Sequence, residues 1–174
     1  MPVLEILRYP DPRLKRKSAP VSEITPSHLE LLDDMIETMY KAKGVGLAAP
    51  QVGVNERLVV IDVHPREEGE VRKHGDPEVI ELINPEIIES KGEVVAEEGC
   101  LSVPGFSSEV KRRASVTVRG LNRYGDELEF EASELLARAV QHEVDHLDGL
   151  LFFDRLSRLK RELFKKHIDR VLVD

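Results

Sequence analysis

The spacing of apolar residues predicts an amphipathic helix near the start of the chain, over about residues 26–42. Its apolar positions recur every three or four residues, as expected for one face of a helix: Leu29, Leu32, Ile36, Met39 and Tyr40. Thr25 and Pro26 form a typical helix start, in which a capping residue precedes proline at the first helical position. Gly44 is expected to end this helix.

Later segments rich in β-branched residues are predicted to be strands. They cover residues 57–63, 79–83, 87–96, 110–119 and 127–132. The polar segment 64–78 contains Pro65, Gly69, Gly75 and Pro77, so we expect a surface loop or a hairpin excursion there. The last two predicted strands are joined by residues 122–126, which have the composition of a turn.

A second helix is predicted to begin after Ser133, its N-cap, and to stop at Gly149. One face of this helix carries an apolar stripe that two histidines continue, at helical spacing: Leu135, Ala139, His142 and His146. Both histidines are therefore expected to point into the protein rather than into solvent.

A last helix is predicted over about residues 154–171. Its buried side is expected to contain Leu156, Leu159, Leu163, Phe164 and Ile168. Several strands followed by a late helix imply an α+β fold. We expect bent antiparallel sheets packed around a central helix that carries the histidines, with an N-terminal and a C-terminal helix. No linker or repeat divides the chain, so residues 1–174 are predicted to form a single domain.

Composition and charge narrow the class of protein. Hydrophobic residues make up 41% of the 174 residues and charged residues 33%, which is typical of a globular protein that is not membrane-embedded. The first residues have no signal or transit pattern, and a single cysteine excludes an internal disulfide, so we expect a cytoplasmic protein. The net charge is −8, yet residues 155–174 carry +4, which marks the last helix as a candidate contact for an anionic partner. Nothing in the sequence indicates specific binding to DNA.

The second predicted helix contains the motif H-E-x-x-H. His142 and His146 lie one turn apart on the same face, where two imidazoles can hold one metal ion. Glu143 lies beside the first histidine and can take the proton of a metal-bound water and later deliver it to a leaving group.

Two histidines hold a metal ion poorly, so a third ligand is expected. Asp, Glu or His is the usual choice after such a motif. Cys100 is the better candidate here, because it lies in a glycine- and proline-containing turn after a strand and its thiolate would bind a soft or borderline metal firmly. A lone cysteine is otherwise most often a small buried hydrophobic residue. Three ligands and an open position are the pattern of a catalytic metal site.

The glycine-rich stretch Gly44–Gln51 is a candidate binding segment. Its small residues let the backbone pass close to a ligand. The amide of Gln51 could stabilise the oxyanion of a tetrahedral intermediate if it lies opposite the metal. By itself, such a stretch after a helix is usually a helix cap and a turn.

Together, three stretches resemble the motifs of the peptide deformylases. That family has G-x-G-x-A-A-P-Q, E-G-C-L-S and Q-H-E-x-D-H-x-x-G in this order. They correspond here to Gly44–Gln51, Glu98–Ser102 and Gln141–Gly149, without a departure at any fixed position.

The resemblance implies removal of the N-formyl group from the formyl-methionine of nascent polypeptides, with release of formate. It implies that Cys100, His142 and His146 bind the metal and that Glu143 is the general base and acid. It further implies that Gln51 and the backbone N–H of Leu101 stabilise the oxyanion, and that backbone near Val45, Gly46 and Gly99 holds the peptide as an added strand. The walls of the methionine pocket would include Val45, Leu101 and Ala139.

The resemblance also implies a divalent metal, most commonly Fe²⁺, with Zn²⁺, Ni²⁺ or Co²⁺ able to occupy the same ligands. It implies a transient contact with the ribosome through the C-terminal helix, which the positive charge of that helix would favour.

Two other functions fit the H-E-x-x-H motif alone. A metalloprotease would use the same motif, but would need a wide cleft and typically a histidine or glutamate as its third ligand. In a non-catalytic metal-binding module, Cys100 and the two histidines would be purely structural, and Glu143 would be dispensable.

Overall fold

The computed structural model describes residues 3–173, and it shows an α+β fold built on one antiparallel sheet. The sheet has five strands in the order β1-β2-β3-β4-β5, and each strand pairs with the next. Their bounds are Gly46–Ala48, Leu58–Ile61, Ile80–Cys100, Val103–Leu121 and Glu127–Ser133. The predicted fold class is therefore confirmed as α+β, although the strands form one sheet rather than several.

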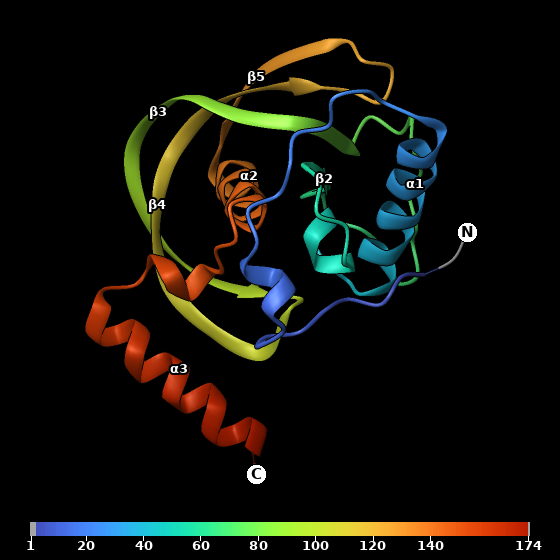
Figure 1. Cartoon of the computed structure of the whole chain (residues 1–174). Helices are drawn as coiled ribbons and strands as arrows, with labels where there is room; N and C mark the ends of the chain where they lie inside the picture. The colour runs from blue at the N-terminus through green and yellow to red at the C-terminus, as the bar shows by residue number, and fades with distance from the viewer. Residues whose placement is uncertain (1–2, 174) are drawn as a thin grey trace.

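Two of the predicted strands, 79–83 and 87–96, are parts of the single long strand β3. Pro85 lies between the two predicted strands, at a register shift between Ile83 and Glu86. A bulge tolerates proline because one residue there leaves the hydrogen-bonded ladder. A further shift follows between Ile87 and Glu89, and β3 and β4 curve together as a long hairpin (Figure 1). A bulge bends the strand that contains it, which accounts for this curvature.

Helix α1 spans Pro26–Lys41 with Thr25 as its N-cap, close to its predicted bounds. Its inner face buries an unbroken row of apolar side chains, which packs on residues of β1 and β2: Leu32, Met35, Ile36 and Met39. This cluster is the core on one side of the glycine-rich stretch, and it fixes where that stretch leaves the helix.

Helix α2 spans Glu134–Leu147 and lies on the concave side of the β3–β4 hairpin (Figure 1). It shares a buried cluster with strands β2 to β5 that includes Ala137, Val140 and Leu147. Gly149 follows the helix with a φ of +79°, and a side chain there would collide with the backbone of Lys15 and Arg16. The glycine is therefore needed both for the turn and for the close approach of the N-terminal segment.

The C-terminal helix is shorter than predicted. Residues Phe152–Arg155 form a separate 3₁₀ helix, η3, and α3 spans Arg158–Val173. Phe164 and Ile168 lie on its inner side, as predicted, and they pack against the phenylalanines of η3. The prediction was wrong for Leu159 and Leu163, which are 71% and 57% exposed. Only one side of α3 faces the body of the protein, so the helix cannot bury every apolar residue on its surface.

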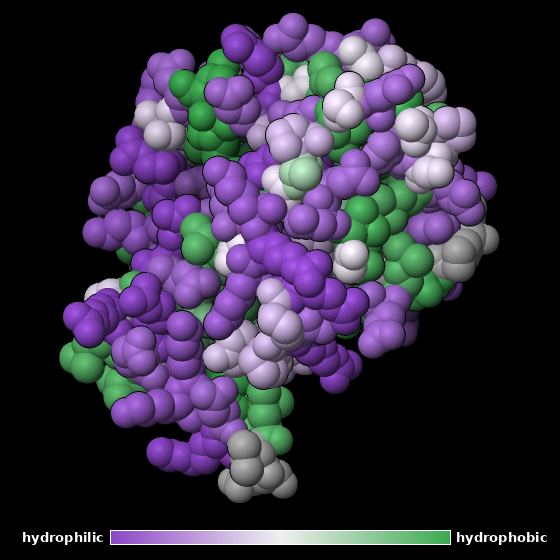
Figure 2. All heavy atoms as spheres, viewed as in Figure 1, coloured by the Kyte–Doolittle hydropathy of each residue, from purple (hydrophilic) through white to green (hydrophobic). Residues whose placement is uncertain are grey.

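Helix α3 projects from the body at its lower left in Figure 1, and the same projection is mostly hydrophilic in the space-filling view (Figure 2). Among residues 3–173, no helix combines the length and the apolar character that crossing a membrane requires.

Candidate metal centre

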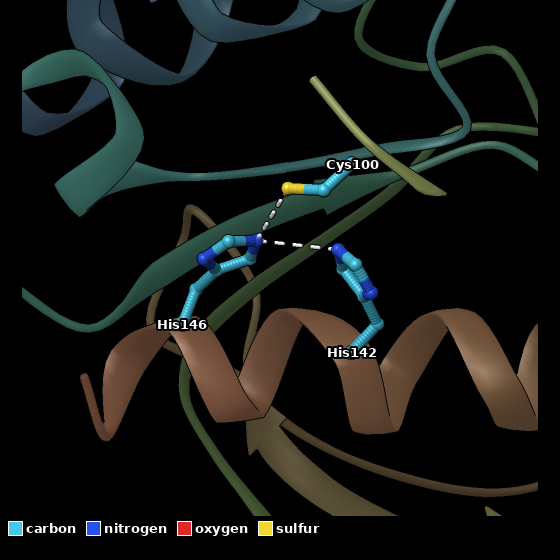
Figure 3. A group of neighbouring side chains, drawn as sticks. All are labelled: Cys100, His142 and His146. Carbon is cyan, nitrogen blue, oxygen red and sulfur yellow. Dashed lines mark hydrogen bonds between the residues drawn. The ribbon is translucent and has the colours of Figure 1, made fainter. Parts of the chain in front are cut away.

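Three side chains from two distant segments meet at one point. Cys100 is the last residue of β3, and His142 and His146 lie one turn apart on α2 (Figure 3). The Nε2 atom of His146 lies 3.3 Å from the sulfur of Cys100 and 3.2 Å from Nε2 of His142. All three candidate ligand atoms lie within 4.8 Å of one another.

This arrangement fits a bound metal ion. Nitrogen and sulfur ligands at about 2.0–2.3 Å from a tetrahedral ion lie roughly 3.3–3.6 Å from each other. The two measured distances of 3.2 and 3.3 Å are close to this range. Three donors of these types leave one position open, and they suit borderline divalent metals rather than magnesium or calcium.

A carboxylate orients the first histidine. Oε1 of Glu98, which lies two residues before Cys100, is 3.1 Å from Nδ1 of His142. A carboxylate on the far ring nitrogen fixes the orientation and the tautomer of a metal-binding imidazole. Burial raises the pKa of Glu98, but hydrogen bonds from Arg112 and His142 outweigh it and lower the pKa to about 2. Glu98 therefore remains a carboxylate at neutral pH.

Behind this carboxylate lies a buried cluster of ion pairs centred on Arg112. The guanidinium donates to both oxygens of Glu98, at 2.8 and 2.9 Å, and also to Asp145. Asp145 in turn accepts from Arg155 of η3. The sequence motif contains Glu98 and Asp145 but says nothing of their shared partner. Arg112 is one of many basic residues, and no local pattern distinguishes it.

Glu143 is buried beside the candidate metal ligands, with 3% of its surface exposed. Burial raises its pKa to about 7. Its Oε1 atom has no hydrogen-bond partner among the described residues. Gly46 of β1 lies directly against its other oxygen, so that a Cβ at this position would overlap the carboxylate. A carboxyl group of this kind can exchange a proton near neutral pH.

The amide of Gln51 is held in one orientation. Its Oε1 accepts the backbone N–H of Ala48 at 2.9 Å, and its Nε2 donates to Ser102 at 3.1 Å. Nε2 also lies 3.7 Å from the sulfur of Cys100, so this N–H donor is directed at the candidate metal centre. Gln51 belongs to the 3₁₀ helix η2, Ala49–Val52, which follows β1.

One cavity of about 580 Å³ joins these groups. It is lined by every expected site residue except His146: Val45, Gly46, Gly99, Cys100, Leu101, Gln51, His142 and Glu143. His146 is buried and contacts the other two candidate ligands. Arg138 and Ala139 also line this cavity.

Strand β1 forms one side of the cavity and was not predicted. The sequence suggested a binding segment, or otherwise a cap and a turn, but Gly46–Ala48 pair with Val59–Ile61 at the edge of the sheet. The N–H of Asp62 bonds to the carbonyl of Val45. In an antiparallel ladder, bonded and non-bonded pairs alternate, so the N–H and the carbonyl of Gly46 point away from β2. They face the open edge of the sheet.

Known proteins are similar to this chain in sequence and in fold. The family described as polypeptide deformylase matches residues 3–162 of the chain. The chain belongs to the polypeptide deformylase family. It is therefore a hydrolase, of the family that deformylates nascent peptides.

Individual peptide deformylases are similar over nearly the whole chain. That of Thermodesulfovibrio yellowstonii is 56% identical over 166 residues, which cover 95% of this chain and 96% of the relative. The peptide deformylase structure from Legionella pneumophila is 45% identical, with a TM-score of 0.86 over 98% of this chain and 95% of that one. The structure from Synechococcus elongatus, in complex with actinonin, is 37% identical, with a TM-score of 0.84 over 96% of this chain and 88% of that one.

Proposed function

We propose that this deformylase removes the N-formyl group from the formyl-methionine of nascent peptides by metal-assisted hydrolysis. One observation supports the proposal most directly. Cys100, His142 and His146 lie together at a cavity that is also lined by Glu143, whose carboxyl group is buried. Cys100, His142 and His146 would hold one divalent ion. When bound, such an ion lowers the pKa of a water molecule and polarises a carbonyl group.

Glu143 would act as general base and then as general acid. Its carboxylate takes the proton of the attacking water and gives it to the departing amine nitrogen. The pKa of about 7 suits both steps, because a group that exchanges protons near the working pH serves as base and acid in turn. The unpartnered Oε1 atom is free to accept that proton.

Gln51 and the backbone N–H of Leu101 would stabilise the negative charge that develops on the formyl oxygen. The contacts of Gln51 with Ala48 and Ser102 hold its amide in place before the substrate arrives. A donor fixed in advance contributes roughly 2.7–4 kcal/mol to such a transition state.

The open edge of β1 would bind the peptide as an added strand. Gly46 presents its backbone groups to this edge, and Val45 and Gly99 line the same cavity. The methionine side chain would lie against Val45, Leu101 and Ala139. Because the formyl group is small, these contacts supply most of the positioning of the substrate.

We propose Fe²⁺ as the resident metal, with Zn²⁺, Ni²⁺ or Co²⁺ able to take its place. Two imidazoles and a thiolate accept all four ions. The test is formate release from formyl-Met-Ala-Ser by anaerobically purified protein, with the metal content measured in parallel. An active preparation that contains only zinc would contradict the choice of iron.

The variant Glu143→Gln tests the role of Glu143. It keeps the shape of the side chain but cannot exchange the proton, so we expect formate release to fall at least about 100-fold. The metal content should stay unchanged. Glu93→Gln is the control, because Glu93 is exposed and pairs only loosely with Lys111, at 3.8 Å. That variant should retain full activity.

The same assay separates the alternatives. Cleavage of formyl-Met-Ala-Ser but not of acetyl-Met-Ala-Ser or of an internal peptide bond supports deformylation. Cleavage of the internal bond would indicate a metalloprotease. Undiminished function in Glu143→Gln would indicate a metal-binding module without catalysis.

We also propose that α3 makes a transient contact with the ribosome. Its residues, 158–173, carry a net charge of +4, and it projects from the body (Figure 1). Nascent formylated chains emerge from ribosomes, so this proposal places the enzyme in the cytoplasm.

A further inference from the structure

Arg138 lies on the face of α2 that lines the cavity. Leu135, Arg138, Ala139 and His142 are spaced by three or four residues along α2, and all four line the cavity. Arg138 therefore borders the space beside the candidate metal ligands. Leu135 lies one turn before Arg138 and is 41% exposed, so it marks the outer end of the cavity. Side chains on a helix lean toward its N-terminus, so we expect the guanidinium to lie on the side of Leu135 rather than of His142.

The guanidinium of Arg138 has no partner of its own. Among residues 3–172, it makes no hydrogen bond, ion pair or ring contact. The other arginine close to the centre, Arg112, is fully engaged with Glu98 and Asp145. An arginine that is half-buried in a cavity and unpaired offers planar, two-pronged recognition to a carboxylate.

The other charged groups around the cavity do not neutralise the guanidinium of Arg138. Glu98 is paired with Arg112, and Glu143 is buried beside the candidate metal ligands with 3% of its surface exposed. Lys43 and Glu97 are both exposed at the rim, and Glu97 accepts a hydrogen bond from Ser107. The charge of Arg138 is thus available to the ligand.

The strand geometry assigns a position in the substrate. In an extended peptide, alternate side chains point to the same side, and they are about 6.6 Å apart. If the methionine side chain enters the cavity beside α2, then the third residue points to the same face and the second residue points away from it. The Cα atom of Arg138 is four residues from that of His142, which corresponds to about 6 Å along a helix.

We infer that Arg138 is a specificity-determining residue that favours an acidic side chain at the third residue of the formylated peptide. This inference rests on the proposed deformylation and on the binding of the peptide as an added strand. The group that Arg138 would recognise is a carboxylate of the peptide near the outer end of the cavity.

The test compares kcat/KM for amidated peptides, in which no C-terminal carboxylate competes. The series is formyl-Met-Ala-X-Ser-amide with X as glutamate, glutamine or lysine, and formyl-Met-X-Ala-Ser-amide with the same three residues. Partly exposed ion pairs contribute enough to predict a preference of about two- to fivefold for glutamate over glutamine at the third position. Raising the salt concentration to about 1 M should reduce the preference, because exposed charges are then screened.

Variants of Arg138 assign the preference to its charge. The ratio of glutamate to glutamine should persist in Arg138→Lys, fall to about one in Arg138→Met and invert in Arg138→Glu. Lys111→Gln is the matched control, since Lys111 is an exposed cation on β4 outside the cavity, and its ratio should equal that of the wild type.

Two results would overturn the inference. One is equal kcat/KM across the third position, or a preference confined to the second position. The other is a preference that survives Arg138→Met and disappears in Lys43→Gln, which would assign it to Lys43. These failures are distinct from failure of the proposed function, in which no formylated peptide of the series would release formate.

Discussion

At the scale of single residues, the placement of Glu143 depends on the absence of a side chain at Gly46. The carboxylate occupies the space that a Cβ of residue 46 would fill. Gly46 does not have a positive φ, so its backbone would accept alanine without strain. The glycine is therefore required by close packing rather than by backbone conformation.

We expect Gly46→Ala to lower kcat by between about tenfold and 100-fold, because the carboxylate of Glu143 must move by about 1 Å to make room for the Cβ. The metal content should be unchanged, since no ligand is displaced. Formate release and metal analysis measure the two quantities.

A double variant checks that the effect passes through Glu143. If Gly46→Ala acts by displacing this carboxylate, it should lower kcat little further when it is added to Glu143→Gln. If the reduction of kcat in the double variant equals the product of the two single reductions, Gly46 acts by another route, such as direct obstruction of the peptide.

At the scale of secondary-structure elements, Arg112 joins the parts of the site. Through Glu98, Asp145 and Arg155, its cluster ties β4 to β3, to α2 and to η3. Glu98 also holds His142. Burial lowers the pKa of Arg112, but its two carboxylate partners outweigh it and raise the pKa above its usual range. The cluster therefore remains charged.

We expect Arg112→Met to lower the free energy of unfolding by about 3–5 kcal/mol, because Glu98 and Asp145 lose the arginine that they share. Metal affinity should fall by about 10- to 100-fold, since Glu98 would no longer be held against His142. Denaturant unfolding and competition with a chelator measure these effects.

The neighbouring Lys111→Met is the control. Lys111 is exposed and should change the free energy of unfolding by less than about 1 kcal/mol. Arg112→Lys keeps the charge and should be intermediate if the first variant does not fold. Wild-type stability and metal affinity in Arg112→Met would show that the cluster does not support the site.

At the scale of the whole molecule, charge and shape are unevenly distributed. Residues 155–174 carry +4 and the remainder of the chain carries −12. Helix α3 projects from the body with a mostly hydrophilic surface, and Lys160, Lys166 and Arg170 on it are exposed. Arg161 and Lys165 are half-buried, and Lys165 lies over the ring of Phe153, at 5.8 Å.

We expect replacement of Lys160, Lys166 and Arg170 by glutamate to weaken binding to ribosomes and to leave the hydrolysis of formyl-Met-Ala-Ser unchanged, because these residues lie outside the cavity. Co-sedimentation with ribosomes at two salt concentrations measures the binding. Reversing Arg161 and Lys165 as well would strengthen the effect, but it would also disturb the packing of α3.

The control reverses Lys91 and Lys111, which are exposed on the β3–β4 hairpin. Ribosome binding that is unchanged by the α3 variant, or equally weakened by the control, would contradict the proposed role of α3.

Local patterns predicted α1, α2 and β5 closely, because capping residues and apolar spacing act within one element. They failed where a partner decides the outcome. Strand β1 has three residues, and only its pairing with β2 makes it a strand. Leu159 and Leu163 have the spacing of a buried face, but no surface covers them. A single domain over residues 1–174 stays a prediction.

By itself, the sequence determined the types of chemical group at the site and the face that two of them share. His142 and His146 must lie on one side of a helix, because their spacing is close to one turn. Only the tertiary structure decided which groups meet them. The curvature of β3 brings Cys100 and Glu98 to that face, and the pairing of β1 brings Gly46 against Glu143. Such contacts depend on register and bending in a sheet, which are set by partners far away along the chain.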